Sequence, residues 1–183
     1  MVHFSEIESL RASLQFLAFS DAYLDSAARL CAIRAASPQE SSYSRGAVVL
    51  SLTFHGIELF LKAAILEKMP SEQLGGRTGH DLEYLYGKYS GLYPEKEHAF
   101  EIPFSSEELD FASLDPRVAE EFKAFIAKSK RATPTDQLHR YPRDIQGQPW
   151  EGIFSFEPNS FLQVVSQVHE DIARLKEMLF RVE

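Results

Sequence analysis

A long apolar segment constrains the fold of this chain more than any other feature. It runs from Tyr43 to Lys68, YSRGAVVLSLTFHGIELFLKAAILEK, and its hydrophobic side chains recur on nearly every face of a helix. A helix that is hydrophobic all round has to be covered on all sides, as the central helix of a bundle is. Polar residues interrupt it, so it has no unbroken apolar run of about 18 residues that would span a membrane. We expect a central helix in one core, and no membrane partner.

Amphipathic segments on both sides of this helix supply the elements that would cover it. Apolar residues repeat at three- and four-residue steps from about Ser5 to Ala36, which predicts one long helix. A third helix begins at GHDLEYLYGKY, where Thr78 and Asp81 have the spacing of a capping box. The last helix is expected from about Ser160 to Arg181, with Asn159 as its cap. Its predicted buried face comprises Leu162, Val165, Val168, Ile172, Leu175 and Leu179.

The chain between the third and last helices is acidic at first and punctuated by proline. We expect residues 90–115 to form an irregular excursion with one short helix at Ser106–Leu114. A further helix starts at Asp115, with Pro116 at its first position. No segment has a persuasive strand pattern, and no internal repeat is present. The sequence therefore predicts a single domain over residues 1–183, all-α, as an antiparallel up-and-down bundle of four to five helices.

Composition excludes several classes of protein. A length of 183 residues with 44% hydrophobic side chains suits one domain with a sizeable core, and the net charge of −8 argues against a general nucleic-acid coat. The single cysteine, Cys31, excludes an intramolecular disulfide and a cysteine-based zinc cluster, and its apolar helical position predicts an inert buried thiol. The scattered histidines have no metal-ligand spacing, and GGRTGH lacks the Gly-Lys-Ser/Thr ending of a phosphate loop. The N-terminus has no signal pattern. We expect a cytoplasmic protein without metal or cofactor.

Ser51, His55, Glu58 and Lys62 form a polar line on the central helix, because steps of four, three and four residues place them on one face. An isolated buried charge is costly, so these side chains need partners. Glu58 precedes Lys62 by one turn, the favourable order for an ion pair. Three interpretations are open. The face reaches solvent at the edge of the bundle, or it lines a groove against another helix or a second subunit, or it serves catalysis.

A second concentration of ionisable groups is LHRYPRD, Leu138–Asp144. The guanidinium forks of Arg140 and Arg143 suit phosphate or carboxylate, and Tyr141 can stack on a base or donate a hydrogen bond. The chain just before this motif is basic as well, in contrast to the acidic chain as a whole. The motif is an anion- or nucleotide-binding site, a basic surface that faces the acidic stretch Glu95–Glu121, or part of a catalytic site.

Three short segments occur in an order that is known from one family of helical proteins. They are IELFLKAAI (Ile57–Ile65), GHDLEYL (Gly79–Leu85) and RYPRD (Arg140–Asp144). This order resembles the HEPN domain family, named for higher eukaryotes and prokaryotes nucleotide binding. The resemblance implies four to five antiparallel helices and frequently a homodimer. It directs attention to Glu58, Lys62, His80, Asp81, Arg140, Tyr141 and Pro142. Asp81 can also cap the third helix, and Glu58 can pair with Arg140 across the bundle as well as with Lys62.

The roles that this resemblance implies include antitoxin-linked ribonucleases, partners of minimal nucleotidyltransferases and nucleotide-binding modules. Its ribonuclease members carry an R-x(4–6)-H motif. This chain lacks that spacing, because nine, two and seven residues separate Arg45 from His55, Arg77 from His80 and Arg131 from His139.

We therefore expect a non-catalytic module that binds a protein partner, a nucleotide or an RNA end. Its candidate binding residues are His55, Glu58, Lys62, His80, Arg140, Tyr141 and Arg143. One alternative is a divergent, metal-independent ribonuclease in which His139 or His80 acts with Arg140. The other alternative is a dimeric helical scaffold without a ligand.

Overall fold

The computed structural model describes residues 3, 5–103, 117–118, 120–121, 124, 138–144, 146–150 and 155–180. Within them, the structure is all-α, as predicted, and the β contacts amount to an isolated bridge between Arg143 and Pro149. The α-helices of this part are α1 (Ser5–Glu8), α2 (Ala12–Ala36), α3 (Tyr43–Lys68), α4 (Leu82–Leu92) and α7 (Pro158–Leu179). Short 3-10 helices are η1 (Pro38–Glu40), η2 (Arg77–His80) and η3 (Lys96–His98).

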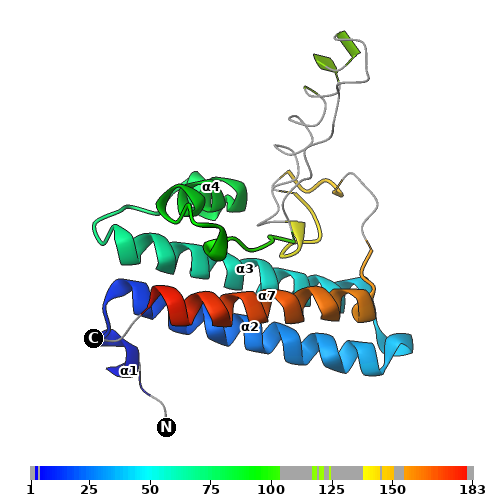
Figure 1. Cartoon of the computed structure of the whole chain (residues 1–183). Coiled ribbons are helices and arrows are strands. Elements are labelled where there is room, and N and C mark those ends of the chain that lie inside the picture. Colours follow the sequence, from blue (N-terminus) through cyan, green and yellow to red (C-terminus); the bar gives the residue numbers. More distant parts are fainter. Residues whose placement is uncertain are drawn as a thin grey trace.

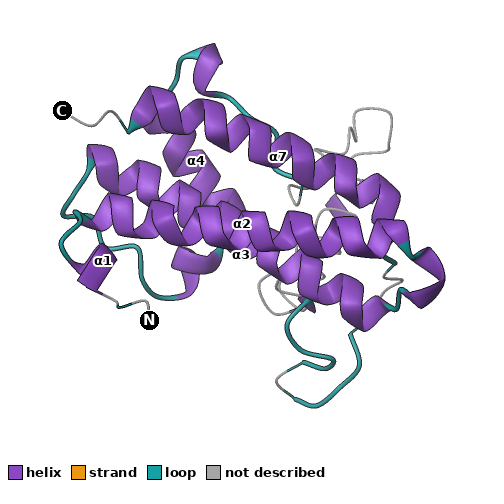
Figure 2. Cartoon of the chain, turned by 90° about the horizontal axis from the view of Figure 1, so that it is seen from below, coloured by secondary structure: helices purple, strands orange, loops and turns teal. Residues whose placement is uncertain are grey.

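Helix α3 lies at the centre of the described fold, with the bounds that the sequence predicts. Helices α2 and α7 lie along it on one side and run in the opposite and the same direction, respectively, while α4 covers the other side (Figure 1). A view turned by 90° shows α2 directly over α3, with α7 beside them (Figure 2). By length and composition α3 could cross a membrane, but 78% of its most apolar stretch is buried inside the fold. Burial in the core accounts for its apolar composition.

Close packing of α2 on α3 depends on a glycine. A Cβ atom at Gly56 would lie 2.7 Å from Cγ of Leu24, so a larger residue would force the two helices apart. Next to this contact, Ser20 Oγ donates a hydrogen bond of 2.7 Å to the carbonyl of Gly56. Further along α2, Cys31 is fully buried, as predicted, and burial raises the pKa of its thiol to about 11. The thiol is therefore protonated and inert at neutral pH.

The start of the first helix differs from the sequence prediction. The helix expected over residues 5–36 is broken between Glu8 and Ala12, where Arg11 has an extended backbone at the start of α2. The side chain of Arg11 forms an ion pair of 2.8 Å with Glu67 at the far end of α3, and Ser13 Oγ donates to the same carboxylate at 2.6 Å. These tertiary contacts are favoured over continuation of a regular helix. The spacing of apolar residues along the sequence gives no indication of them.

Of the predicted helix starts, the Asp81 cap is confirmed, whereas the capping box and the Asn159 cap are wrong. Asp81 is itself the cap of α4, and its carboxylate accepts from the backbone N–H of Tyr84 at 3.0 Å, so the capping box that begins at Thr78 does not form. Helix α7 begins at Pro158 and is capped by Glu157 instead of Asn159. Backbone N–H groups donate to the Glu157 carboxylate and lower its pKa to about 2. A carboxylate at a helix start is stabilised by the helix dipole as well.

The predicted excursion contains part of the core. Its first residues, 90–92, complete α4, and the segment that follows buries Tyr93, Phe100 and Ile102 against α3 and α7. The acidic chain is therefore structured well beyond the point at which irregular structure was expected. The predicted helix at Ser106–Leu114 and the predicted helix start at Asp115 lie outside the described residues.

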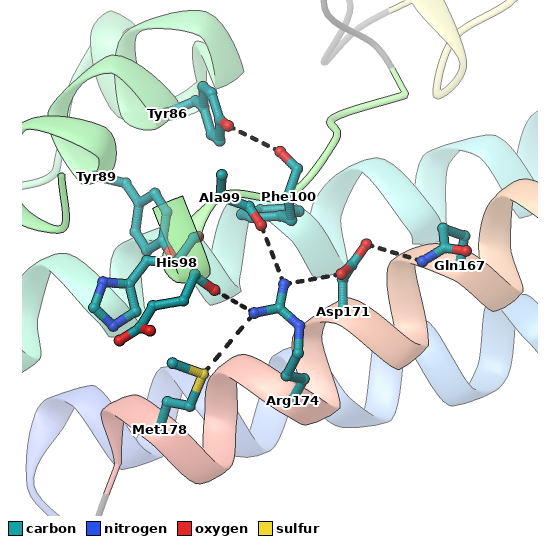
Figure 3. Close-up of polar contacts among 10 residues, drawn as sticks. Tyr86, Tyr89, His98, Ala99, Phe100, Gln167, Asp171, Arg174 and Met178 are labelled. Atoms are coloured by element: carbon teal, nitrogen blue, oxygen red, sulfur yellow. Dashed lines mark hydrogen bonds and ion pairs between the residues drawn. The ribbon is translucent and has the colours of Figure 1, made fainter. Parts of the chain in front are cut away.

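One arginine of α7 holds this segment from one side. Arg174 donates to the backbone carbonyls of Glu97 and Ala99, the latter at 3.1 Å, and its guanidinium pairs with Asp171 Oδ1 at 2.9 Å (Figure 3). Asp171 thereby orients the fork of donors toward the segment. Charge-assisted hydrogen bonds of this kind are stronger than neutral ones.

Two tyrosines of α4 hold the same segment from the opposite side. Tyr89 Oη donates to the carbonyl of His98 at 2.7 Å, and Tyr86 Oη donates to that of Phe100 at 2.8 Å (Figure 3). Four consecutive carbonyls, 97–100, thus alternate between a donor on α7 and a donor on α4. We call this arrangement the carbonyl ladder. It fixes the backbone of a segment whose own regular structure is limited to the short η3.

Candidate functional site

A buried ion pair forms the base of the site. Glu58 has no exposed side-chain surface, and Lys62 Nζ donates to Glu58 Oε1 at 2.7 Å with only 8% of the lysine side chain exposed. The pair expected from the helical spacing is therefore present. It does not face solvent at the edge of the fold, which excludes the first interpretation of the polar line for these two residues. Taking both charges out of water requires other partners.

The loop after α3 brings the first of these partners. His80, at the end of η2, places Nδ1 3.1 Å from Glu58 Oε1, so an N–H there donates to the oxygen that Lys62 also reaches. Its ring is 48% exposed. The turn into η2 needs Gly76, whose φ of 72° is a conformation that favours glycine. The adjacent Asp81 cap fixes the helix that follows.

His55 and Arg140 complete the arrangement on the other carboxylate oxygen. His55 Nδ1 lies 3.4 Å from Glu58 Oε2, and the guanidinium of Arg140 lies 3.2 Å from the same His55 nitrogen. Tyr23 of α2 contacts the imidazole edge to face, with ring centroids 4.7 Å apart. Arg140 thus reaches the site through His55. We call His55, Glu58, Lys62, His80 and Arg140 the polar cluster.

The polar cluster joins three segments that lie far apart in the sequence. They are the middle of α3, the turn at η2 and the segment 138–144, which are the same three that carry the family resemblance. Five of the seven candidate binding residues meet there. Sequence spacing placed three of them on one helix. The sequence offered Glu58 as a partner for Arg140, whereas the structure places the Arg140 guanidinium against His55.

The two other candidates, Tyr141 and Arg143, lie on the segment that carries Arg140 and are not among the five residues of the polar cluster. Tyr141 is 58% exposed, and its carbonyl accepts from Trp150 Nε1 at 2.7 Å. Arg143 donates to the carbonyl of Gly147 at 2.9 Å. His139, a candidate in the ribonuclease alternative, is half-buried, and burial lowers the pKa of its imidazole. Ser51 is half-buried on α3.

The polar cluster keeps Glu58 ionised. Burial alone would raise the pKa of this carboxyl group, but the nearby imidazole of His55 and the hydrogen bond and positive charge of Lys62 lower it from 4.5 to about 2. The carboxylate is then negative at every pH of biological interest, and it can orient both imidazoles. Because both rings turn Nδ1 toward Glu58, the nitrogen of each that remains for another partner is Nε2.

Sequence reasoning missed two contributors to the site. Tyr23 lies on α2, where nothing in the spacing relates it to His55. Gly79 allows the loop to close over the ion pair, because a Cβ atom at this position would clash with the Leu74 carbonyl and lie near Lys62. The signal for Gly79 was present in the sequence, as a glycine directly before the His-Asp pair.

The donor set of this site does not form a metal centre. No group of three or more His, Cys, Asp or Glu side chains suited to a metal ion occurs in the part of the chain that the structure describes. A cation in the polar cluster would also be repelled by Lys62 and Arg140.

Comparison of the chain with protein-family models, curated protein sequences and solved structures finds no match. The resemblance to the HEPN family therefore stays a prediction that rests on the three segments.

Substitution of Gly79 tests how tightly the loop closes. A Cβ atom at this position would lie 2.3 Å from the backbone oxygen of Leu74 and 4.0 Å from Lys62 Nζ, so Gly79→Ala must displace the backbone. We expect a loss of about 1–3 kcal/mol in the free energy of unfolding, which is typical of overpacking. Chemical denaturation measures it.

Gly75→Ala is the matched control, because a Cβ atom there meets no heavy atom within 4 Å. Its effect should stay below about 0.5 kcal/mol, as for surface substitutions in general. Equal effects of the two substitutions would contradict tight closure at Gly79.

Proposed function

We propose that this chain is a HEPN-like helical protein of the cytoplasm that binds a phosphate-bearing ligand, a nucleotide or an RNA end, at the polar cluster. The convergence of the three resembling segments on one site supports the family part of this proposal. The antiparallel HEPN-like bundle and the homodimer belong to the same proposal.

The class of ligand is inferred from one observation. The polar cluster presents hydrogen-bond donors next to an ion pair whose two charges already neutralise each other. Glu58 and Lys62 cancel each other's charge, which leaves the charge of Arg140 in excess. His55 Nδ1 accepts from Arg140, so the neutral His55 ring carries its proton on Nε2, which can donate to a ligand. A compact anion with several acceptor oxygens matches this set of donors.

The neighbouring residues fit a nucleotide better than a bare anion. Tyr141 follows Arg140 directly and is largely exposed, and Arg143 lies on the same segment. An exposed aromatic ring beside a phosphate site can stack on a base, and such stacking contributes about 1–3 kcal/mol per base.

Binding of adenosine monophosphate and of inorganic phosphate, measured by isothermal titration calorimetry, tests the proposal. We expect Arg140→Ala to weaken both ligands by about tenfold or more, since a hydrogen bond to a charged group contributes about 1.5–3 kcal/mol. Arg29→Ala is the matched control: it removes the same charge from a side chain whose ion-pair partner is Asp25 on α2. Its effect should be less than twofold.

Three outcomes of this experiment lead to different conclusions. Weakening by Arg140→Ala alone supports the proposed site. Equal weakening by both substitutions means that net charge, and not the polar cluster, attracts the ligand. No binding by the parent protein rejects the phosphate ligand and favours the scaffold or a protein partner.

A metal-independent ribonuclease is the second candidate, favoured by the carboxylate that orients two imidazoles. In such an enzyme one Nε2 atom removes the 2′-hydroxyl proton while Arg140 stabilises the charge that develops on phosphate. Incubation with a mixed RNA pool in EDTA tests it, beside Arg140→Ala shown to be folded. Cleavage by the parent alone would support the enzyme, and absence of cleavage would reject it.

A further inference from the structure

One nitrogen atom of His55 has two neighbours that require opposite protonation states. Arg140 is a donor at every pH, so its contact of 3.2 Å with Nδ1 requires a lone pair on that nitrogen. Glu58 Oε2, 3.4 Å from the same nitrogen, is an acceptor and requires a proton there. Nδ1 cannot satisfy both neighbours at once.

The structure has the arrangement of a neutral imidazole. Arg140 occupies Nδ1, and Glu58 Oε2 is fully buried without a hydrogen bond from any residue that the structure describes. A buried acceptor without a donor costs about 1–3 kcal/mol. The other oxygen, Oε1, is already used by Lys62 and His80, so the unsatisfied capacity faces His55 alone.

We propose that His55 is a proton-linked latch for Arg140, and that anion binding at the polar cluster is coupled to proton uptake by this residue. A proton on Nδ1 completes the bond to Glu58 Oε2 and turns the nitrogen into a donor. Arg140 then has no acceptor on His55, and its guanidinium is released toward the anion. The coupling to an anion rests on the proposed function, whereas the latch itself does not.

The charged and titratable groups around His55 are consistent with this exchange. Tyr23 faces it from α2, Glu58 and Lys62 lie on its own helix, His80 faces the cluster from η2, and Arg140 comes from residues 138–144. Protonation adds a positive charge beside two others, and Glu58 offsets only one of them. A bound dianion offsets the rest, which is why proton and anion favour each other's binding.

The chain contains its own reporter of the latch. Trp150 is the only tryptophan, and its Nε1 donates to the carbonyl of Tyr141, the residue after Arg140. Release of Arg140 should therefore change the environment of this indole. We expect the fluorescence of the ligand-free protein to change in one step over the pH range in which histidines titrate.

Three variants test whether His55 and Arg140 cause this change in fluorescence. His55→Gln keeps an acceptor for Arg140 but cannot take up the proton, so the step should be lost. Arg140→Gln, at an exposed position where unfolding is not at issue, should lose it too. His80→Gln should retain it, because His80 contacts the other oxygen of Glu58. Persistence of the step in folded His55→Gln or in Arg140→Gln would overturn the latch.

Calorimetry with sulfate in buffers of different ionisation enthalpy tests the coupling, because sulfate keeps its charge throughout this range. The parent should take up close to one proton per sulfate, and its affinity should rise by up to about tenfold for each unit of pH decrease. In His55→Gln the change should stay below twofold. Sulfate binding without proton uptake would overturn the coupling while supporting the proposed function. A fluorescence step without sulfate binding would support the latch and reject the proposed anion site.

Discussion

Replacement of Glu58 by leucine should lower the free energy of unfolding by about 3–5 kcal/mol, because it leaves the buried ammonium group of Lys62 without its partner. Lys62→Met should cost less. In that variant Glu58 keeps the N–H of His80 and can gain a proton on His55, whereas Lys62 depends on Glu58. The asymmetry follows from the geometry of the polar cluster, and chemical denaturation of the two variants measures it.

The double variant Glu58→Leu with Lys62→Met should recover most of the lost stability. Two apolar side chains of similar volume suit this part of α3, which is surrounded by core residues, and buried ion pairs are often replaceable in this way. The same variant should lose anion binding, since the carboxylate that both imidazoles contact through Nδ1 is then absent. If the double variant is as unstable as Glu58→Leu, the loss comes from His55 and His80 and not from the orphaned lysine.

Acid should lower the free energy of unfolding by a large amount, because Glu58 becomes protonated. The pKa of this group is 4.5 in an unfolded chain and about 2 in the fold. Above 4.5 both states are ionised, and the favourable surroundings contribute about 3 kcal/mol to folding. As the pH falls from 4.5 toward 2, the unfolded chain binds the proton first, so this contribution decreases. Below 2 it is gone.

Other carboxylates titrate in the same range, so the contribution of Glu58 has to be measured as a difference in the free energy of unfolding between the parent and a variant without this carboxylate. The free energy of unfolding of the parent minus that of Glu58→Gln should be about 3 kcal/mol near neutrality and should approach zero near pH 2. A difference that stays constant across this range would show that Glu58 is not ionised in the fold.

The sequence predicted the elements that depend on local pattern. The bounds of α3 were correct because its apolar pattern lies between the polar SPQESS segment, which contains Pro38, and the Pro- and Gly-containing chain that begins at Met69. The core positions of α7 were largely correct for the same reason: Val165, Val168 and Ile172 repeat at helical spacing and are buried. Local spacing also gave the ion pair of α3.

Features that depend on tertiary contact could not be predicted in this way. The break before α2 arises from the pairing of Arg11 with Glu67, two residues that are distant in sequence. The contact between Arg140 and His55 spans 85 positions and has no periodic signal. The cap of α7 was misassigned because Glu157 and Asn159 are both plausible there, and only the path of the backbone decides between them.

The carbonyl ladder has a consequence for how this sequence can vary. Arg174, Tyr86 and Tyr89 recognise backbone oxygens of the segment Glu97–Phe100, and every amino acid carries such an oxygen. The ladder therefore places its requirement on the donors in α4 and α7 and little on the side chains at positions 97 and 99. Substitutions can accumulate at those two positions without altering the path of the chain, whereas loss of a donor alters it directly.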